Sequence, residues 1–216
     1  MKFYLLEDAF QKTFHKEIKG KKIYIVDGEF IRTHLDIEFT NFGTHYHFPD
    51  LIPKGEIWLD KEYDPGEINY FITSAITEYD KMAAGESYED AHDTAEKVET
   101  NQRGKTMLRK DNCRIKLWKK LAKANLKIFI VDGEAVRDQY DIDFTEGGNS
   151  GRYDFIPKSE IWIDDDIAPK ERKYVLAHEL FEKGAMEKRG LSYEEAHKQA
   201  SKYEKQLRKK NKRSVI

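Results

Sequence analysis

The sequence repeats itself at long range, and this repeat limits the architectures that the chain can adopt. The segment IYIVDGE at Ile23 returns as IFIVDGE at Ile128, an offset of 105 residues, and SYEDAH returns as SYEEAH at the same offset. This period is too long for a solenoid repeat and matches the size of a small domain. The sequence therefore predicts a tandem duplication, with a first repeat at 1–104 and a second at 105–216. The alternative is one domain in which both copies share a core.

Each repeat carries the same succession of secondary-structure signals. An amphipathic segment precedes a β-branched strand that runs into Asp-Gly, which is typical of a hairpin turn. An alternating strand, a Gly-rich loop, a further strand and two amphipathic segments follow. We interpret this as an α-β-β-β-α-α unit of an α+β fold, in which a small antiparallel sheet packs on helices. The predicted elements of the first and second repeat are a helix (8–19; 112–124), three strands (23–26, 35–39, 56–59; 128–131, 140–144, 160–163) and two helices (65–83, 87–100; 169–188, 192–209).

The composition argues against several classes of protein and site. Lys and Arg number 38 against 40 Asp and Glu, whereas a generic nucleic-acid-coating protein is normally basic. The lone Cys113 excludes an intramolecular disulfide and a cysteine-rich zinc site, and it is typical of a reducing compartment, so we expect a cytoplasmic protein. No apolar run approaches the roughly 20 residues of a membrane span, and we expect no membrane partner.

One cluster of residues has the composition of a metal site. His178 and Glu182 are four positions apart in a predicted helix, which places both side chains on one face. An imidazole and a carboxylate supply two of the three protein ligands of a catalytic zinc ion, and His197 on the next predicted helix is the best-placed third ligand. The sequence therefore predicts a Zn²⁺ site formed by these three residues, beside which Glu179 can accept a proton.

The segments around this cluster resemble those of a known family. The stretch from Ile161-Trp-Ile-Asp through Ala177-His-Glu-Leu is similar to the strand, connector and active helix of zincin metallopeptidases, especially the compact repressor-cleaving zinc peptidases of mobile elements. The resemblance covers part of the second repeat only. It implies a zinc-dependent peptidase with a protein or peptide substrate, in which His178 is a zinc ligand and Glu179 the catalytic base. The family motif HExxH has a histidine where this chain has Glu182, so the order of ligand types differs.

The first repeat lacks the main residues of this cluster. Ser74, Ala75 and Glu78 occupy the positions of the HExxE motif, so the first ligand and the base are missing. We therefore expect a degenerate copy that serves as a scaffold or binding surface. However, His92 persists there at the position of His197. A structural role for this histidine, hydrogen-bonded between helices, is therefore an alternative to metal binding.

Other features support competing hypotheses. The chain can instead be a non-catalytic interaction module of a phage or mobile element that binds a host protein, a setting that the family resemblance implies. The basic stretches 103–127 and 208–213 can hold nucleic-acid phosphates, although solvated faces of helices explain them more simply. His34, His45 and His47 in the first repeat are candidates for a separate metal site.

Overall fold

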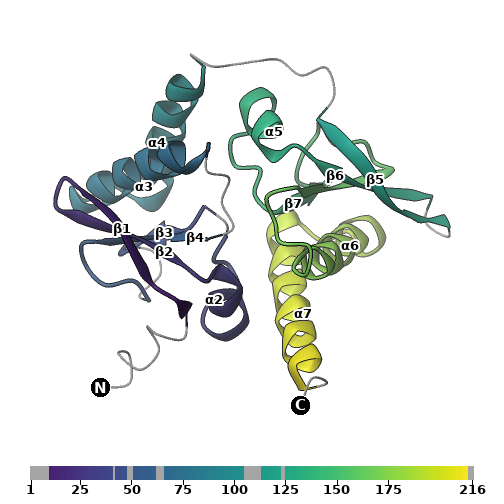
Figure 1. The fold of residues 1–216 in the computed structure, drawn as a ribbon. Helices are drawn as coiled ribbons and strands as arrows, with labels where there is room; N and C mark the ends of the chain where they lie inside the picture. The colour runs from purple at the N-terminus through teal and green to yellow at the C-terminus, as the bar shows by residue number, and fades with distance from the viewer. Residues whose placement is uncertain are drawn as a thin grey trace. The chain divides into compact units, whose positions relative to one another are not determined.

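The chain forms two compact units, Met1–Leu108 and Arg109–Ile216 (Figure 1). The structure is a computed structural model that describes residues 10–40, 42–47, 51–61, 66–104, 113–122 and 125–213. These residues contain six helices and two four-stranded sheets, a mixed content that agrees with the predicted α+β class.

Both units contain the same elements in the same order. The first unit consists of β1 (Thr13–Ile18), β2 (Lys21–Val26), α2 (Gly28–His34), β3 (Thr44–His45), β4 (Glu56–Asp60), α3 (Ile68–Ala83) and α4 (Tyr88–Arg103). The second unit consists of β5 (Arg114–Leu121), β6 (Leu126–Val131), α5 (Gly133–Gln139), β7 (Gly147–Asn149), β8 (Glu160–Asp164), α6 (Arg172–Arg189) and α7 (Tyr193–Arg213). The strand orders β1-β2-β4-β3 and β5-β6-β8-β7 are equivalent.

Each sheet is mixed, so the prediction of an antiparallel sheet is wrong. The two central strands run parallel, β2 beside β4 and β6 beside β8, while the outer strands pair with them in antiparallel fashion. A helix, α2 or α5, lies between the two central strands along the chain. Because such a crossover returns the chain in its original direction, the central strands become parallel.

The first predicted element of each repeat is a strand and not a helix. β1 occupies half of the segment 8–19, and β5 occupies most of the segment 112–124. Residues 8, 9, 112, 123 and 124 of those predictions lie outside the described residues. Lys19 and Gly20 have positive φ angles of 51° and 74°, which suit the two-residue hairpin turn that joins β1 to β2. Both strands lie at a sheet edge. Charged residues at an edge strand discourage pairing with another chain. The lysines of these segments therefore belong to exposed edge strands and do not mark the polar face of a helix.

The Asp-Gly pairs begin helices, whereas the sequence predicted hairpin turns. The Asp27 carboxylate accepts a backbone N–H at 3.0 Å and caps α2, and Asp132 caps α5 in the same way at 2.9 Å. Gly28 is required because a Cβ there would overlap the carboxylate of Asp60, which accepts the Gly28 N–H at 3.1 Å. The segments 35–39 and 140–144, predicted as strands, are turns that follow α2 and α5.

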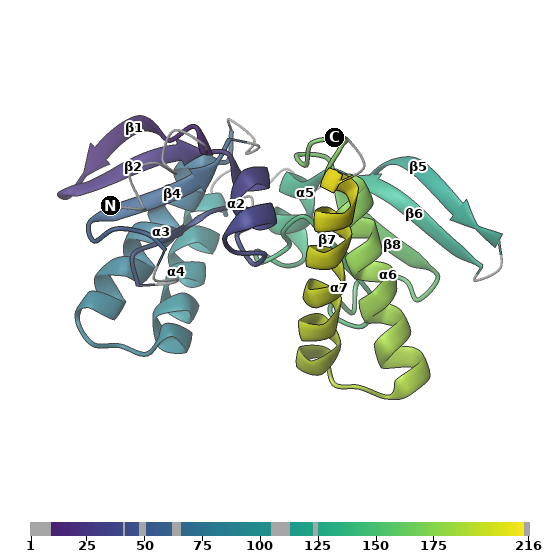
Figure 2. The ribbon, with the colours of Figure 1, turned by 90° about the horizontal axis from the view of Figure 1, so that it is seen from below.

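Side chains cover both faces of each sheet. Ile128 and Ile130 of β6 pack against Val175 and Leu176 of α6, whereas the neighbouring Val131 packs near α5 on the opposite face. The first sheet has the same arrangement, with α3 against one face and α2 against the other. α6 is thus held against the second sheet, and α7 packs on α6 (Figure 2).

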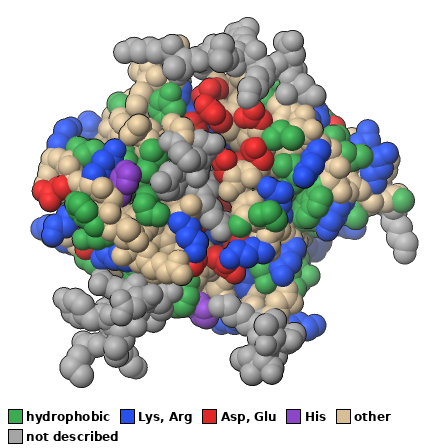
Figure 3. Space-filling view, in the orientation of Figure 1, with side chains coloured by type: hydrophobic (Ala, Val, Ile, Leu, Met, Phe, Trp, Pro, Cys, Tyr) green, Lys and Arg blue, Asp and Glu red, His purple; other side chains and the backbone are tan. Residues whose placement is uncertain are grey.

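The surface of the described residues carries mixed charge. Figure 3 shows Lys and Arg side chains interspersed with Asp and Glu on the face that it displays. None of the described helices is long and apolar enough to cross a membrane.

Candidate metal centre

Two helices of the second unit bring the predicted ligands together. α6 supplies His178 and Glu182 on one face, one turn apart, and α7 supplies His197. The chain reverses at Gly190, whose left-handed backbone (φ 65°) ends α6, and the two helices then lie side by side (Figures 1 and 2). Ligand atoms of these three residues all lie within 4.8 Å of one another.

Distances among the three side chains match those of a tetrahedral metal site. Nε2 of His178 lies 3.1 Å from Nδ1 of His197 and 3.5 Å from Oε2 of Glu182. Nδ1 of His197 lies 3.0 Å from Oε2 of Glu182. Ligands that bind zinc at about 2.0–2.1 Å in a tetrahedron are separated from one another by about 3.3 Å. The three atoms therefore form one face of a tetrahedron of suitable size for zinc.

Either protons or a metal ion can occupy this triangle. Each of the two inward-facing imidazole nitrogens either carries a proton or presents a lone pair. If both carry protons, both N–H groups can donate to Oε2 of Glu182, with the two nitrogens only 3.1 Å apart. If only one does, at least one of the three contacts joins two acceptors. A divalent cation satisfies all three lone pairs at once.

Buried polar side chains hold the site in place. Nδ1 of His178 lies 3.0 Å from Oε2 of Glu204, and Nδ2 of Asn149 donates to Oε1 of Glu182 at 2.8 Å. The same nitrogen of Asn149 donates to Oε2 of Glu179 at 2.8 Å, so the predicted base and a predicted ligand share one donor. Carboxylate and amide partners of this kind orient metal ligands in many proteins.

The site is most open to solvent at His197. The His197 side chain is 34% exposed, compared with 11% for His178 and 3% for Glu182. The ring of Tyr193 lies 5.5 Å from that of His197, centroid to centroid, and packs on this more open side chain.

Burial and charge shift the pKa values of these groups in different directions. Burial lowers the pKa of His178, but hydrogen bonds with Glu182 and Glu204 outweigh it and raise the pKa to about 11. Burial likewise raises the pKa of Glu182, yet the two imidazoles lower it to about 2. Burial and the nearby Glu182 charge raise the pKa of Glu179 to about 7. At neutral pH Glu182 is therefore ionised and Glu179 can exchange a proton, whereas His178 holds a proton that a bound metal ion would displace.

The first unit holds a different cluster at the corresponding place. Nε2 of His45 lies 2.7 Å from Oε1 of Glu78, and Nδ1 of His92 lies 2.9 Å from Oε2 of the same carboxylate. The two imidazoles thus bind opposite oxygens of one carboxylate. In the part of the chain that the structure describes, these three side chains do not form a group with ligand atoms all within 4.8 Å.

This comparison bears on the two interpretations of His197. Both units have a histidine of the last helix bound to a glutamate of the preceding helix, His92 to Glu78 and His197 to Glu182. An interhelical hydrogen bond is therefore present in each unit, as the structural interpretation expects. The second unit differs because His178 adds a further imidazole nitrogen to the contact.

The separate metal site suggested for the first repeat is not assembled. His34 packs on the ring of Phe30 at 4.4 Å, whereas His45 binds Glu78. The backbone N–H of His47 donates to Nδ1 of His45 at 3.2 Å. Among the residues with described positions, these three histidines do not form a metal-capable group.

Two residues of the centre were not predicted, Asn149 and Glu204. Asn149 lies in β7, and only the packing of β7 beside α6 brings it to the site. Glu204 follows His197 by seven residues, which places it on the same face of α7 two turns later. Helical periodicity was therefore a usable signal for Glu204, but not for Asn149.

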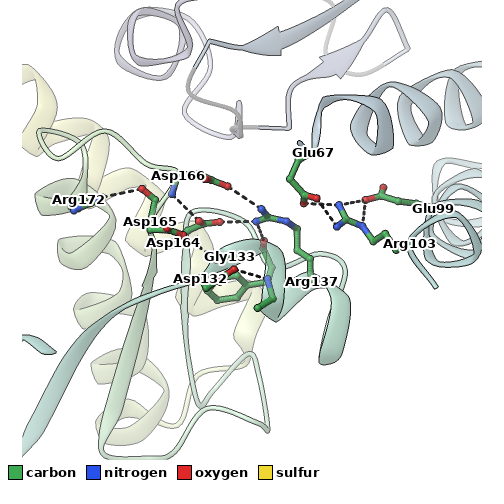
Figure 4. A network of polar contacts seen from close by, with 12 residues as sticks. Glu67, Glu99, Arg103, Asp132, Gly133, Arg137, Asp164, Asp165, Asp166 and Arg172 are labelled. Atoms are coloured by element: carbon green, nitrogen blue, oxygen red, sulfur yellow. Dashed lines mark hydrogen bonds and ion pairs between the residues drawn. The ribbon is translucent and has the colours of Figure 1, made fainter. Parts of the chain in front are cut away.

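A second acidic cluster lies at the end of β8. Asp164, Asp165 and Asp166 offer oxygens within 4.8 Å of one another. However, Arg137 pairs with Asp164 at 2.7 Å and with Asp166 at 3.0 Å, so an arginine offsets part of this charge (Figure 4). This pairing ties α5 to the end of β8.

Comparisons with known proteins do not assign a function. No family model, curated protein or solved structure matches the chain.

Proposed function

We propose that the second unit is a zincin-like, zinc-dependent hydrolase of peptide bonds, with His178, Glu182 and His197 as the zinc ligands. The observation that carries this proposal is the triangle of donor atoms 3.0–3.5 Å apart. The donor set also fits zinc, since two imidazoles and one carboxylate are common protein ligands of catalytic zinc and leave a fourth position open. Bound zinc would act as a Lewis acid that polarises the scissile carbonyl.

Glu179 has the properties required of the catalytic base. It directly follows His178, is 7% exposed, and has a pKa raised to about 7 by burial and by the charge of Glu182. A carboxylate with this pKa can take a proton from the attacking water and return it to the leaving amine. Nδ2 of Asn149 donates to Oε2 of Glu179 at 2.8 Å, and the backbone N–H of Gly151 donates to Oδ1 of Asn149 at 2.7 Å.

The order of ligands is part of this proposal. Zincin peptidases with the HExxH motif take two ligands from one helix as histidines, whereas here a histidine and Glu182 lie on α6 and the second histidine lies on α7. Both ligand sets contain two imidazoles and one carboxylate. The charge that they present to the ion is therefore the same as in sites built from two histidines and one glutamate.

We also propose that the two units arose by duplication and that the first is a non-catalytic copy. Equal element order and equal strand order support the duplication. Ser74 and Ala75 stand in place of the first ligand and the base, and the remaining Glu78 is bound by imidazoles on both oxygens. The first unit then serves as a scaffold or binding surface.

The activity test compares the zinc-loaded wild type with Glu179→Gln. Both proteins are incubated with a mixture of unstructured peptides, and new termini are identified by mass spectrometry. We expect the variant to be slower by about 10²-fold or more with unchanged zinc content, because it loses only the proton acceptor. Glu78→Gln removes a carboxylate of the first unit and, assayed where both units are folded, should cleave at the wild-type rate. A zinc-loaded wild type that cleaves no peptide, or a Glu179→Gln variant as fast as the wild type, would contradict the proposal.

A further inference from the structure

A series of buried charged groups extends from His178 away from the metal centre. Oε2 of Glu204 lies 3.0 Å from Nδ1 of His178, and Nε of Arg208 donates to Oε1 of Glu204 at 2.8 Å. Nη1 of Arg208 donates to both carboxylate oxygens of Glu171, at 2.7 and 2.9 Å. Glu171, Glu204 and Arg208 are 1%, 5% and 1% exposed. Because buried charges are costly unless they are paired, each member of this series depends on its neighbours.

The first unit contains the same series without the histidine. Nε of Arg103 donates to Glu99 at 2.9 Å, and its two terminal nitrogens donate to Glu67 at 2.9 and 2.7 Å (Figure 4). Ser74, at the position of His178, hydrogen-bonds the carboxyl group of Glu99. The network therefore connects α3 and α4 in a unit that lacks the zinc triangle. Only in the second unit does it end on an imidazole.

We propose that Glu204 is a positioning residue for metal binding, held in place by Arg208 and Glu171; this inference rests on the proposed zinc site. The two nitrogens of an imidazole point in different directions, so Glu204 beside Nδ1 does not bind an ion that sits at Nε2. A carboxylate at Nδ1 instead keeps the proton on that nitrogen, leaves the Nε2 lone pair for the ion and fixes the plane of the ring. Its negative charge also makes the imidazole a stronger donor.

The test compares Glu204→Gln with Glu99→Gln in the full chain. Both variants remove one buried carboxylate from an equivalent Arg-Glu-Glu network, but only Glu204 contacts an imidazole of the zinc triangle. Zinc affinity is measured by competition with a chelator, and the visible spectrum of the Co²⁺ form reports the geometry of the ligands. We expect Glu204→Gln to bind zinc about 10- to 100-fold more weakly with an altered Co²⁺ spectrum. Glu99→Gln should match the wild type in both measurements.

Circular dichroism of the metal-free proteins shows whether the variants fold. If Glu204→Gln does not fold, Glu204→Asp keeps the charge but shortens the reach to His178, and it should also weaken zinc binding and alter the Co²⁺ spectrum. A folded Glu204 variant with wild-type affinity and spectrum would overturn the positioning role while the zinc site itself stands. A wild type that binds no zinc would instead overturn the zinc site, and the positioning role with it.

Discussion

At the residue scale, one carboxylate between two imidazoles has different surroundings in the two units. Glu78 binds His45 through one oxygen and His92 through the other, which satisfies both imidazoles without a metal. Glu182 gives one oxygen to Asn149 and directs the other at His178 and His197. One carboxylate oxygen thus has a partner on the sheet side in both units, and the second unit differs because His178 joins the last-helix histidine at the other oxygen.

The Glu78 cluster should make the first unit sensitive to acid. Burial raises the pKa of Glu78, but hydrogen bonds from His45 and His92 outweigh it and lower the pKa to about 2. A depressed carboxyl pKa stabilises the fold above the unfolded value near 4.5, and this stability is lost as the pH falls toward 2. Glu96 also faces this cluster, 3.4 Å from the far nitrogen of His92.

Glu78→Gln should therefore destabilise the first unit at pH 6, by roughly 1–3 kcal/mol, and the difference from the wild type should shrink as the pH approaches 2. Hydrogen exchange of α3 and α4 measures this effect in the full chain. A difference that stays constant from pH 6 to pH 2 would show that the Glu78 charge does not contribute.

The candidate ligands could be predicted because they lie on helices with clear signals. The spacing from His178 to Glu182 is local, and His197 follows a short turn at Gly190, so both arguments need only helical geometry. Asn149 could not be predicted, because its position depends on the pairing of a three-residue strand with β8 and on packing against α6. Long-range contacts of this kind leave no periodic trace in one sequence.

At the element scale, each Asp-Gly pair begins a helix, whereas we predicted that it forms a hairpin turn. Aspartate before glycine suits both a tight turn and a helix N-cap, and the sequence alone does not distinguish them. The four long helices and the strands β4 and β8 lie within four residues of their predicted bounds, since proline, serine and glycine mark their ends. The edge strands were missed because short amphipathic segments fit either period.

Two glycines of the second unit should respond in opposite ways to alanine. A Cβ at Gly133 would overlap the buried Asp164 carboxylate, so Gly133→Ala should destabilise the unit by roughly 1–3 kcal/mol. Gly184 lies inside α6 with nothing near its Cβ position, so Gly184→Ala should stabilise by about 0.5–1 kcal/mol. Urea unfolding measures both changes, and a stable Gly133→Ala would contradict the close approach of Asp164 to α5.

At the scale of the whole molecule, the two units have the same elements in the same order, but the first has Ser74 where the second has the imidazole of His178. The equivalent networks around Arg103 and Arg208 indicate that the helix pairs are built alike in both units. Ser74 contacts Glu99 much as His178 contacts Glu204. The network that contacts His178 in the second unit therefore has a counterpart in the first unit, where it contacts Ser74.

Ser74→His should give the first unit a zinc site. In a His178→Ala background, the new imidazole would join Glu78 and His92, and we expect one zinc ion per chain. Ser74→Ala in the same background is the control and should bind none. A Ser74→His chain without zinc would show that the two scaffolds differ in the orientation of this position.

The most direct test of the zinc site is the stoichiometry of zinc in the full chain, measured by equilibrium dialysis and elemental analysis. The wild type should bind one zinc ion per chain, and His178→Ala should bind none, since one corner of the donor triangle is lost. His92→Ala changes the matching helix of the first unit and should retain the single ion. A wild type without zinc, or a His178→Ala variant that keeps it, would contradict the assignment of His178, Glu182 and His197 as the metal centre.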